Sequence, residues 1–253
     1  MKGALVTGAG MRIGRALALA LAADGFFVFV HHHRSAAAAR ETVAAIVKAG
    51  GKAKAVRADL SSARQAEALV GKCRARGVRL TCLVNSAALF KLDRAPTAKA
   101  ADFDLHMAIN LRAPLILSQA LARQMPEDQT GLVVNLLDQK LYNLNPDFLT
   151  YTLSKVGLQG LTKLLAQALA PRIRVAGIAP GLTLRSGSQT DARFAQQRKQ
   201  NPLGVGVTTD DLVRALRFIV ATPTFTGDTL LVDSGEHLSG RPRDIAFDKH
   251  GKA

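Results

Sequence analysis

Short apolar runs alternate with stretches of helical length along most of the chain, and this alternation limits the possible folds more than any other feature. The apolar runs lie at 2–7, 26–30, 52–57, 80–84, 131–137, 173–179 and 229–232. Strands that alternate with helices at short intervals are typical of a doubly wound parallel sheet, because each crossover between parallel strands needs a connecting helix. The sequence therefore predicts an α/β fold with one seven-stranded parallel sheet flanked by helices.

The stretches between these runs predict helices at 16–24, 35–49, 61–76, 103–124, 148–169 and 209–221. Ser61 is expected to cap the third of these helices, since a serine side chain can accept a backbone N–H at a helix start. The fourth contains Asn110 and Pro114. Proline removes a helical hydrogen bond, so we expect an interruption there.

A chain of 253 residues suits one domain, which we expect to span 1–238. The polar stretch 185–206 is predicted to form a substrate lid around a short helix. The stretch 239–253 is predicted to be a basic tail that is partly disordered or lies across a neighbouring subunit. No apolar stretch approaches the roughly 20 residues that span a bilayer, and the first apolar run is too short for a signal peptide. Cys73 and Cys82 do not have the spacing of metal ligands, and no disulfide framework surrounds them. We therefore expect a cytoplasmic protein with no membrane partner.

The net charge of +15 is the one unusual bulk property. A basic protein attracts polyanions without specificity, so nucleic acid is a candidate partner. The lysines and arginines are nevertheless scattered along the chain and not interleaved with aromatic residues. A basic surface that favours phosphorylated small molecules is therefore the preferred interpretation, and no specific nucleic-acid partner is expected.

A glycine-rich turn follows the first apolar run and precedes an apolar helix. It contains Gly8, Arg12, Ile13 and Gly14. A strand, a glycine turn and a helix in this order present backbone N–H groups and a helix N-terminus to a phosphate. The third glycine comes one residue later than in the common G-x-G-x-x-G fingerprint. The turn predicts a phosphate site of a nucleotide cofactor.

The second apolar run ends in three histidines followed by Arg34 and Ser35. In a nucleotide-binding unit this strand tip faces the adenosine ribose, where a carboxylate selects NAD by repelling a 2′-phosphate. There is no carboxylate here, and His33, Arg34 and Ser35 offer charge and donors suited to a phosphate. NADP(H) is therefore predicted over NAD(H). A metal site is the alternative, but only His31 and His33 would share a strand face, so no metal is expected.

Polar residues also follow the later strands. Asp59 ends the third strand, where it either contacts the adenine or serves as a helix-entry residue. Asp138 ends the very apolar fifth strand. A carboxylate at this place is exposed to solvent, caps a neighbouring backbone segment or takes part in catalysis. Tyr151 and Lys155 lie four residues apart on a predicted helix and so share one face. A cationic amine beside a phenol lowers the phenol pKa and makes the hydroxyl a usable acid or base. A half-buried tyrosine beside a solvated lysine is the alternative.

Together these motifs resemble the short-chain dehydrogenase/reductase family over 2–238. The matching residues are Thr7-Gly8-x-x-x-Arg12-Ile13-Gly14, Asn85-x-Ala87, Asn110, Tyr151-x-x-x-Lys155 and Pro180-Gly181. The resemblance implies a single Rossmann-type domain in which Tyr151 donates the proton to a carbonyl or imine. It also implies that Lys155 binds the nicotinamide ribose and lowers the tyrosine pKa, and that Asn110 holds a water linking the lysine to solvent. Members usually form tetramers through the helices containing Asn110 and Tyr151, so a homotetramer is expected.

The same resemblance gives a set of expected cofactor contacts. These are Gly8, Arg12, Ile13, Gly14, His33, Arg34, Ser35, Asp59, Leu60, Asn85, Ala87, Lys155, Pro180, Gly181 and Thr183.

Two departures from the general family pattern resemble the pteridine reductase branch, which includes bacterial dihydromonapterin and dihydrofolate reductases of this fold. Arg12 replaces the middle glycine of the turn, and Asp138 occupies the usual position of the catalytic serine. In that branch the arginine lies near the cofactor phosphate and the pterin, and the aspartate works with the tyrosine in proton delivery. Phe90 matches an aromatic residue that stacks on the pterin. Ala88 stands where the family has a serine, so fine substrate contacts differ.

The sequence thus predicts an NADPH-dependent reductase that transfers a hydride to a small pteridine-type substrate. Its predicted catalytic residues are Tyr151, Lys155, Asp138 and Asn110, and its predicted substrate contacts are Arg12, Phe90, Asp138 and Tyr151. A carboxyl at position 138 can relay a proton to a ring nitrogen or anchor an amino-pyrimidine edge. The alternatives are a reductase of 3-oxoacyl thioesters or other ketones and, less favoured, an inactive redox-sensing protein of the same fold.

Overall fold

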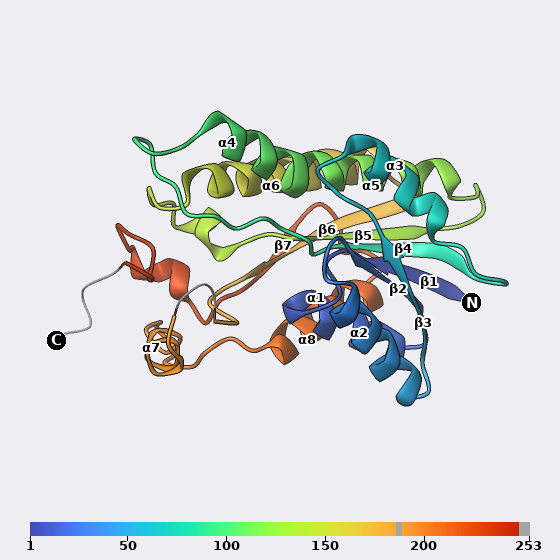
Figure 1. Cartoon of the computed structure of the whole chain (residues 1–253), viewed down its shortest axis with the longest axis horizontal. Coiled ribbons are helices and arrows are strands. Elements are labelled where there is room, and N and C mark those ends of the chain that lie inside the picture. Colours follow the sequence, from blue (N-terminus) through green and yellow to red (C-terminus); the bar gives the residue numbers. More distant parts are fainter. Residues whose placement is uncertain (186–188, 248–253) are drawn as a thin grey trace.

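The computed structural model describes residues 1–185 and 189–247. Seven strands form one sheet in the order β3-β2-β1-β4-β5-β6-β7, and every neighbouring pair is parallel (Figure 1). The fold class predicted from the sequence is confirmed. The strands are β1 (Lys2–Val6), β2 (Phe27–His32), β3 (Lys52–Arg57), β4 (Arg79–Asn85), β5 (Gly131–Leu136), β6 (Ile173–Pro180) and β7 (Thr229–Val232).

Helices cover both faces of the sheet (Figure 1). One face is covered by α1 (Arg12–Ala23), α2 (Ala36–Lys48) and α8 (Thr209–Ala221), and the other by α3 (Ala63–Lys72), α5 (Ala113–Gln124) and α6 (Leu149–Ala168). The helix α4 (Ala100–Met107) packs beside α6, and α7 (Asp191–Gln197) is the short helix predicted inside 185–206. Short 3-10 turns η2 (Gln139–Tyr142) and η3 (Glu236–Ser239) follow β5 and β7.

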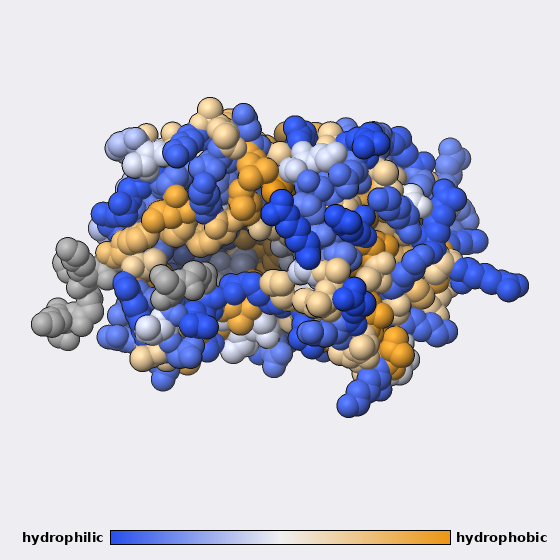
Figure 2. Space-filling model, in the orientation of Figure 1, coloured by the Kyte–Doolittle hydropathy of each residue, from blue (hydrophilic) through white to orange (hydrophobic). Residues whose placement is uncertain are grey.

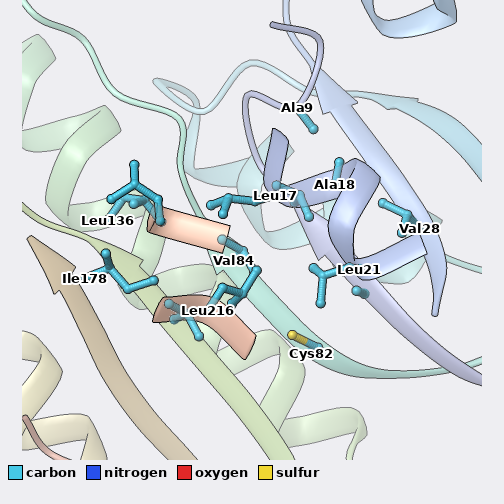
Figure 3. Close-up of a cluster of buried hydrophobic side chains, with 14 of the residues drawn as sticks. Ala9, Leu17, Ala18, Leu21, Val28, Cys82, Val84, Leu136, Ile178 and Leu216 are labelled. Carbon is cyan, nitrogen blue, oxygen red and sulfur yellow. The ribbon is translucent and has the colours of Figure 1, made fainter. Parts of the chain in front are cut away.

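The strands alternate their side chains between two hydrophobic cores. In β1, Ala4 and Val6 belong to the core under α1 and α8, whereas Leu5 belongs to the core under α3 and α5. Figure 3 shows the first core, where Leu17 and Leu21 of α1 meet the sheet. Because successive residues of a strand point to opposite faces, a strand that is apolar throughout fits a sheet buried on both sides.

The long helix predicted at 103–124 is interrupted, as expected. It consists of α4, a π-helix η1 (Ala108–Arg112) that contains Asn110, and α5. Pro114 lies in the first turn of α5 and has no N–H to donate to the carbonyl of Asn110, four residues earlier. The chain accommodates this loss by widening locally into π geometry, which is often found at functional sites.

The predicted cap of the helix at 61–76 is wrong by one residue, and that helix is shorter than expected. Ser62 caps α3 by accepting the Gln65 N–H, and α3 ends at Lys72. The Ser61 hydroxyl donates to the Asp59 carboxylate instead, at 2.7 Å. Asp59 also accepts the Ser61 N–H, so this local turn keeps Ser61 from capping the helix.

The strand order places a crevice at the carboxyl ends of β1 and β4. The chain leaves β1 toward β2 on one side and returns to β4 on the other. Ligands of open parallel sheets bind at such a reversal of strand order. Within the described residues, no helix is both long and apolar enough to cross a bilayer.

Candidate active site

A cavity of about 480 Å³ lies at the carboxyl ends of the strands. Figure 2 shows the molecule hollowed on the side between the α6 layer and the segment around α7. The cavity walls come from the glycine turn, the ends of β4, β5 and β6, the start of α6 and the C-terminal segment. Its lining includes Gly8, Arg12, Ile13, Gly14, Ser35, Ala87, Phe90, Asp138, Tyr151, Lys155, Pro180, Gly181 and Thr183. Most of the site residues predicted from the sequence are therefore brought together.

The glycine turn is shaped by close backbone approach. Gly8 has φ +65°, and a Cβ on it would come within 3.0 Å of the Ala87 Cα. A Cβ on Gly14 would lie 2.5 Å from the carbonyl oxygen of Gly8. The start of α1 has no side-chain cap and no acidic residue in its first turn. The free N–H groups and the positive end of this helix face the cavity, so the turn fits a phosphate of a dinucleotide.

Arg12 has a left-handed backbone, with φ +56°, which is uncommon for a residue with a side chain. Its guanidinium donates to the carbonyl oxygen of Arg185 at 2.7 Å. Arg12 thus connects the glycine turn to the start of the 185–206 segment across the cavity. Residues 186–188 of that segment lie outside the described residues.

The three histidines at the end of β2 have different surroundings. His31 is buried; its Nδ1 accepts the Gly8 N–H and its Nε2 lies 3.1 Å from the Ala58 carbonyl oxygen. Burial lowers the pKa of His31 to about 4, so the ring is neutral and supports the glycine turn. His33 instead lies 3.7 Å from the Asp59 carboxylate. The Asp59 carboxylate, from the end of β3, thus lies beside the end of β2, although β2 itself ends without an acidic residue. No group of metal-ligating side chains occurs within the described residues.

Several predicted cofactor residues lie outside the cavity lining, namely His33, Arg34, Asp59, Leu60 and Asn85. Leu60 is buried in the core with α3. Asn85 is also buried, and its amide donates to Asn135 of β5 at 2.8 Å, which joins the carboxyl ends of two neighbouring strands. Thr183 does line the cavity, and its hydroxyl donates to the Gly181 carbonyl oxygen at 2.9 Å.

The centre of the site is a hydrogen bond between Tyr151 and Asp138. The tyrosine hydroxyl donates to Asp138 Oδ2 at 2.6 Å, and the Lys140 N–H donates to Asp138 Oδ1 at 2.9 Å. Burial raises the pKa of Asp138 above the usual range of a carboxyl, although the hydrogen bond from Tyr151 opposes this. The predicted partnership of an aspartate and a tyrosine is therefore present in the geometry.

The predicted lowering of the tyrosine pKa is wrong for this arrangement. The pKa of Tyr151 is raised well above 10, because burial disfavours the phenolate and the Asp138 carboxylate repels it. The Lys155 amine lies 5.7 Å from the centre of the Tyr151 ring and donates to the Leu136 carbonyl oxygen at 2.5 Å. Burial lowers the pKa of Lys155 to about 8. Tyr151 is thus held as a proton-bearing acid.

Asn110 lies behind Tyr151 and does not line the cavity. Its side-chain oxygen accepts the Leu89 N–H at 2.8 Å, and its amide donates to the Leu89 carbonyl oxygen and to Ser154 Oγ. The Ser154 hydroxyl in turn donates to the Tyr151 carbonyl oxygen. Asn110 therefore ties the loop before Phe90 to the first turns of α6. Its predicted hold on a water stays a prediction.

Phe90 forms an aromatic platform with Phe148. The two rings are stacked with centroids 4.2 Å apart, and the edge of Phe90 meets Tyr151 at 4.7 Å. Phe90 remains 46% exposed, so it keeps surface for a planar ligand. Phe148 precedes α6 in a left-handed conformation and offers no side-chain cap. Asp93 replaces the missing cap by accepting the Thr150 N–H at 3.1 Å.

The C-terminal segment 241–247 folds over the site of its own chain. The expectation that the tail is partly disordered or lies across a neighbouring subunit stays a prediction. Asp147 is fully buried and accepts from Arg94, from Arg243 and from the Asp244 N–H. Asp244 pairs with the buried Lys140 amine at 2.9 Å. Lys140 and Asp147 both lie between Asp138 and Tyr151, so the segment holds this loop. On its other side, Arg193 and Gln197 of α7 donate to its backbone carbonyl oxygens. The remainder of the predicted tail, 248–253, lies outside the described residues.

The family model for short chain dehydrogenases matches residues 2–197. The chain belongs to the short-chain dehydrogenase family.

The names of two relatives of this short-chain dehydrogenase refer to different substrates, dihydrofolate and a 3-oxoacyl carrier protein. A crystal structure of the FolM alternative dihydrofolate reductase 1 from Brucella suis in complex with NADP is 40% identical, with a TM-score of 0.90, covering 94% of this chain and 95% of that one. A short-chain dehydrogenase from Burkholderia cenocepacia in complex with NADP is 32% identical, with a TM-score of 0.85, over 93% of this chain and 97% of that one. A 3-oxoacyl-[acyl-carrier-protein] reductase from Synechocystis sp. is 32% identical over 92% of this chain and 95% of its own length.

Several cavity residues of this short-chain dehydrogenase were not predicted from the sequence, among them Lys140, Phe148, Glu236 and Asp244. Lys140 lies two residues after Asp138, so its proximity was open to prediction. The other three depend on a strained helix start or on contacts with distant parts of the chain, for which the sequence has no local signal.

We expect NADP⁺ binding to this short-chain dehydrogenase to weaken as the pH rises through about 8. The predicted role of Lys155 at the nicotinamide ribose needs its cationic donor, and its lowered pKa means that this charge is lost above about pH 8. The measurement is the Kd of NADP⁺ from pH 6 to 10. Lys163→Met, which removes an exposed lysine of the same helix, should keep this pH dependence, and Lys155→Met should lose it. A wild-type affinity that is constant across this range would contradict the assignment.

Proposed function

We propose that this protein is an NADPH-dependent reductase that transfers a hydride to a pteridine-type substrate, such as a dihydropterin or dihydrofolate. The proposal rests on one observation above all: a tyrosine hydroxyl bonded to a carboxyl, beside a partly exposed aromatic platform. An ordinary ketone needs only one donor to its oxygen. A planar heterocycle with a ring nitrogen to protonate uses both the platform and a carboxyl that carries protons.

The residues around the glycine turn support binding of NADP. In our assignment, Gly8, Ile13 and Gly14 hold the pyrophosphate by backbone N–H groups. Arg34, Ser35 and His33 hold the 2′-phosphate, and Asp59 and Leu60 lie near the adenine. The nicotinamide end lies between Lys155 and the Pro180-Gly181 turn, where Thr183 also lines the cavity. The remaining assigned contacts are Arg12, Asn85 and Ala87. When bound, NADPH supplies the hydride.

The proton in this reaction comes from Tyr151. As hydride reaches a carbon of a ring C=N bond, the nitrogen takes the proton of the Tyr151 hydroxyl, so the bond becomes CH–NH. Asp138, with its pKa raised by burial, takes up a proton through the cavity and returns it to the phenolate. Lys155 offsets the transient negative charge, and Asn110 holds the first turns of α6 in place. One hydride and one proton are consumed in each turnover.

Reduction of 3-oxoacyl thioesters or other ketones is the second candidate function. Its support is the likeness to 3-oxoacyl-[acyl-carrier-protein] reductases, which reaches 32% identity. Asp138 and the Phe90 platform favour the pteridine, because a thioester ketone has neither a ring nitrogen nor a planar surface to stack. An inactive redox-sensing protein is less favoured, since the Asn110, Tyr151 and Lys155 set is complete.

The proposal also assigns the residues that surround the substrate. We assign the 185–206 segment as a substrate lid within the domain 1–238, because Gln189 of this segment lines the cavity. The substrate contacts in our assignment are Arg12, Phe90, Asp138 and Tyr151. We place the protein in the cytoplasm, where the two buried free thiols of Cys73 and Cys82 stay reduced. No specific nucleic-acid partner, membrane partner or metal is part of the proposal.

A homotetramer is the proposed assembly. Exposed apolar side chains follow the outer faces of α4 and α6, where Phe103, Leu153 and Leu164 are 39%, 44% and 64% exposed. Two helices with such faces can pack against symmetry mates and remove this surface from water. Sedimentation velocity should give a tetramer for the wild type and smaller species for Leu164→Glu. A wild type that sediments as a monomer at micromolar concentration rules this assembly out.

The function is tested by rates of cofactor oxidation with 7,8-dihydropterin, dihydrofolate and an acetoacetyl thioester, each with NADPH and with NADH. We expect turnover of the two pteridines with preference for NADPH. Tyr151→Phe should lower kcat by about a hundredfold or more, because general acid catalysis typically contributes at least that much. The control is Tyr142→Phe, at the other tyrosine of the chain, which does not line the cavity. Reduction of the thioester without the pteridines would favour the second candidate, and activity unchanged in Tyr151→Phe would favour neither.

A further inference from the structure

Glu236 is a buried carboxyl that the proposed proton transfer does not use. It is the first residue of η3, just after β7, and is only 6% exposed. It lines the same cavity as Asp138 and Tyr151. A glutamate is rarely buried without partners, because removing a carboxylate from water costs several kcal/mol.

The hydrogen bonds of Glu236 satisfy only one side of its carboxyl group. Oε2 accepts the Leu182 N–H at 3.3 Å, in the turn that follows β6. Within the described residues, no donor forms a hydrogen bond to Oε1. Burial raises the pKa of Glu236 to about 7, and the nearby Asp138 adds to the effect. A ligand that brings N–H donors to Oε1 would stabilise the ionised carboxylate.

Gln139 supplies a second acceptor in the same cavity. It follows Asp138 directly, lines the cavity, and its side-chain oxygen is buried without a hydrogen-bond partner in the described chain. Its turn η2 packs against η3, as the edge contact between the rings of Tyr142 and His237 shows. Two acceptors that lack a protein donor thus lie on neighbouring elements. The buried Gln139 oxygen costs free energy unless a ligand brings a donor to it.

We infer that Glu236, together with Gln139, accepts the N–H donors of the amino-pyrimidine edge of the substrate. This edge presents an exocyclic amine beside a ring N–H, the donor pattern that a carboxylate accepts in parallel. The inference rests on the proposed function, and it assigns different roles to the two carboxyl groups, Glu236 and Asp138. Glu236 holds the pyrimidine ring, which leaves Asp138 and Tyr151 for the reacting pyrazine ring at the other end of the bicycle.

The test is binding of pterin (2-amino-4-oxopteridine) and of 4-oxopteridine, which keeps the ring N–H but lacks the 2-amino group, to the enzyme–NADP⁺ complex. The wild type should prefer the 2-amino compound by about tenfold or more, as expected for a hydrogen bond to a charged group. Glu236→Gln should lose this preference, because its amide oxygen can still accept the Leu182 N–H while its NH₂ group turns a donor toward the ligand. Its Kd for 4-oxopteridine and its KM for NADPH should stay within about twofold of the wild type.

Glu67→Gln is the matched control, since Glu67 is an exposed surface residue paired with Arg123. Gln139→Met is a second variant that removes an acceptor while nearly keeping the volume, and it should lower the preference by about threefold or more. A 2-amino preference that persists in both variants, or wild-type binding of neither compound, would overturn the inference. Equal weakening of both ligands and of NADPH would also overturn it, because Glu236 would then act only through the Leu182 turn.

Failure of this inference differs from failure of the proposed function. If dihydropterins are reduced but the 2-amino preference is absent, only the Glu236 assignment falls. If the preference is present but no dihydropterin is reduced, the assignment of the carboxyl stands and the pteridine reductase function falls.

Discussion

The hydrogen bond from the Tyr151 hydroxyl to the Asp138 carboxyl is the interaction on which the rest of the site depends. It is only 2.6 Å long and lies where burial penalises both charged forms, so the pKa values of both groups are raised. A lysine near a tyrosine is usually taken to favour the phenolate. Here the amine lies 5.7 Å from the ring centre, whereas the carboxyl touches the hydroxyl, and the nearer group dominates. Both groups therefore favour their protonated forms, which suits a reductase that must deliver one proton in each turnover.

Holding this pair requires control of the loop that joins its two members. Asp138 lies two residues after the end of β5 and Tyr151 lies in the first turn of α6, so the fold fixes each end. The loop between them is held by the buried Asp147, which pairs with Arg94 on one side and with Arg243 on the other. The last described residues of the chain are thus part of the active site. Glu236, which we propose to accept hydrogen bonds from the substrate, is a second part of the site that comes from the C-terminal end of the chain.

The sequence was sufficient for the sheet, the glycine turn, the interrupted helix at Asn110 and the meeting of Phe90, Asp138 and Tyr151. These follow from local periodicity, from backbone rules for glycine and proline, and from a sheet that gathers its strand ends at one edge. Other features depend on distant or competing contacts. Asp147 and Arg243 are 96 residues apart, and Asp59 competes for Ser61 at the start of α3. The tyrosine pKa depends on burial and on the nearest charge, which helical spacing does not reveal.

The most direct test of the central claim is the effect of Asp138→Asn on the reduction of 7,8-dihydropterin. This variant keeps the shape of the side chain and an acceptor for the Lys140 N–H, but its amide cannot carry a proton to Tyr151. The account predicts that kcat falls by about a hundredfold while the KM for NADPH stays close to that of the wild type. A kcat within about twofold of the wild type would contradict the claim that the carboxyl shares in proton delivery.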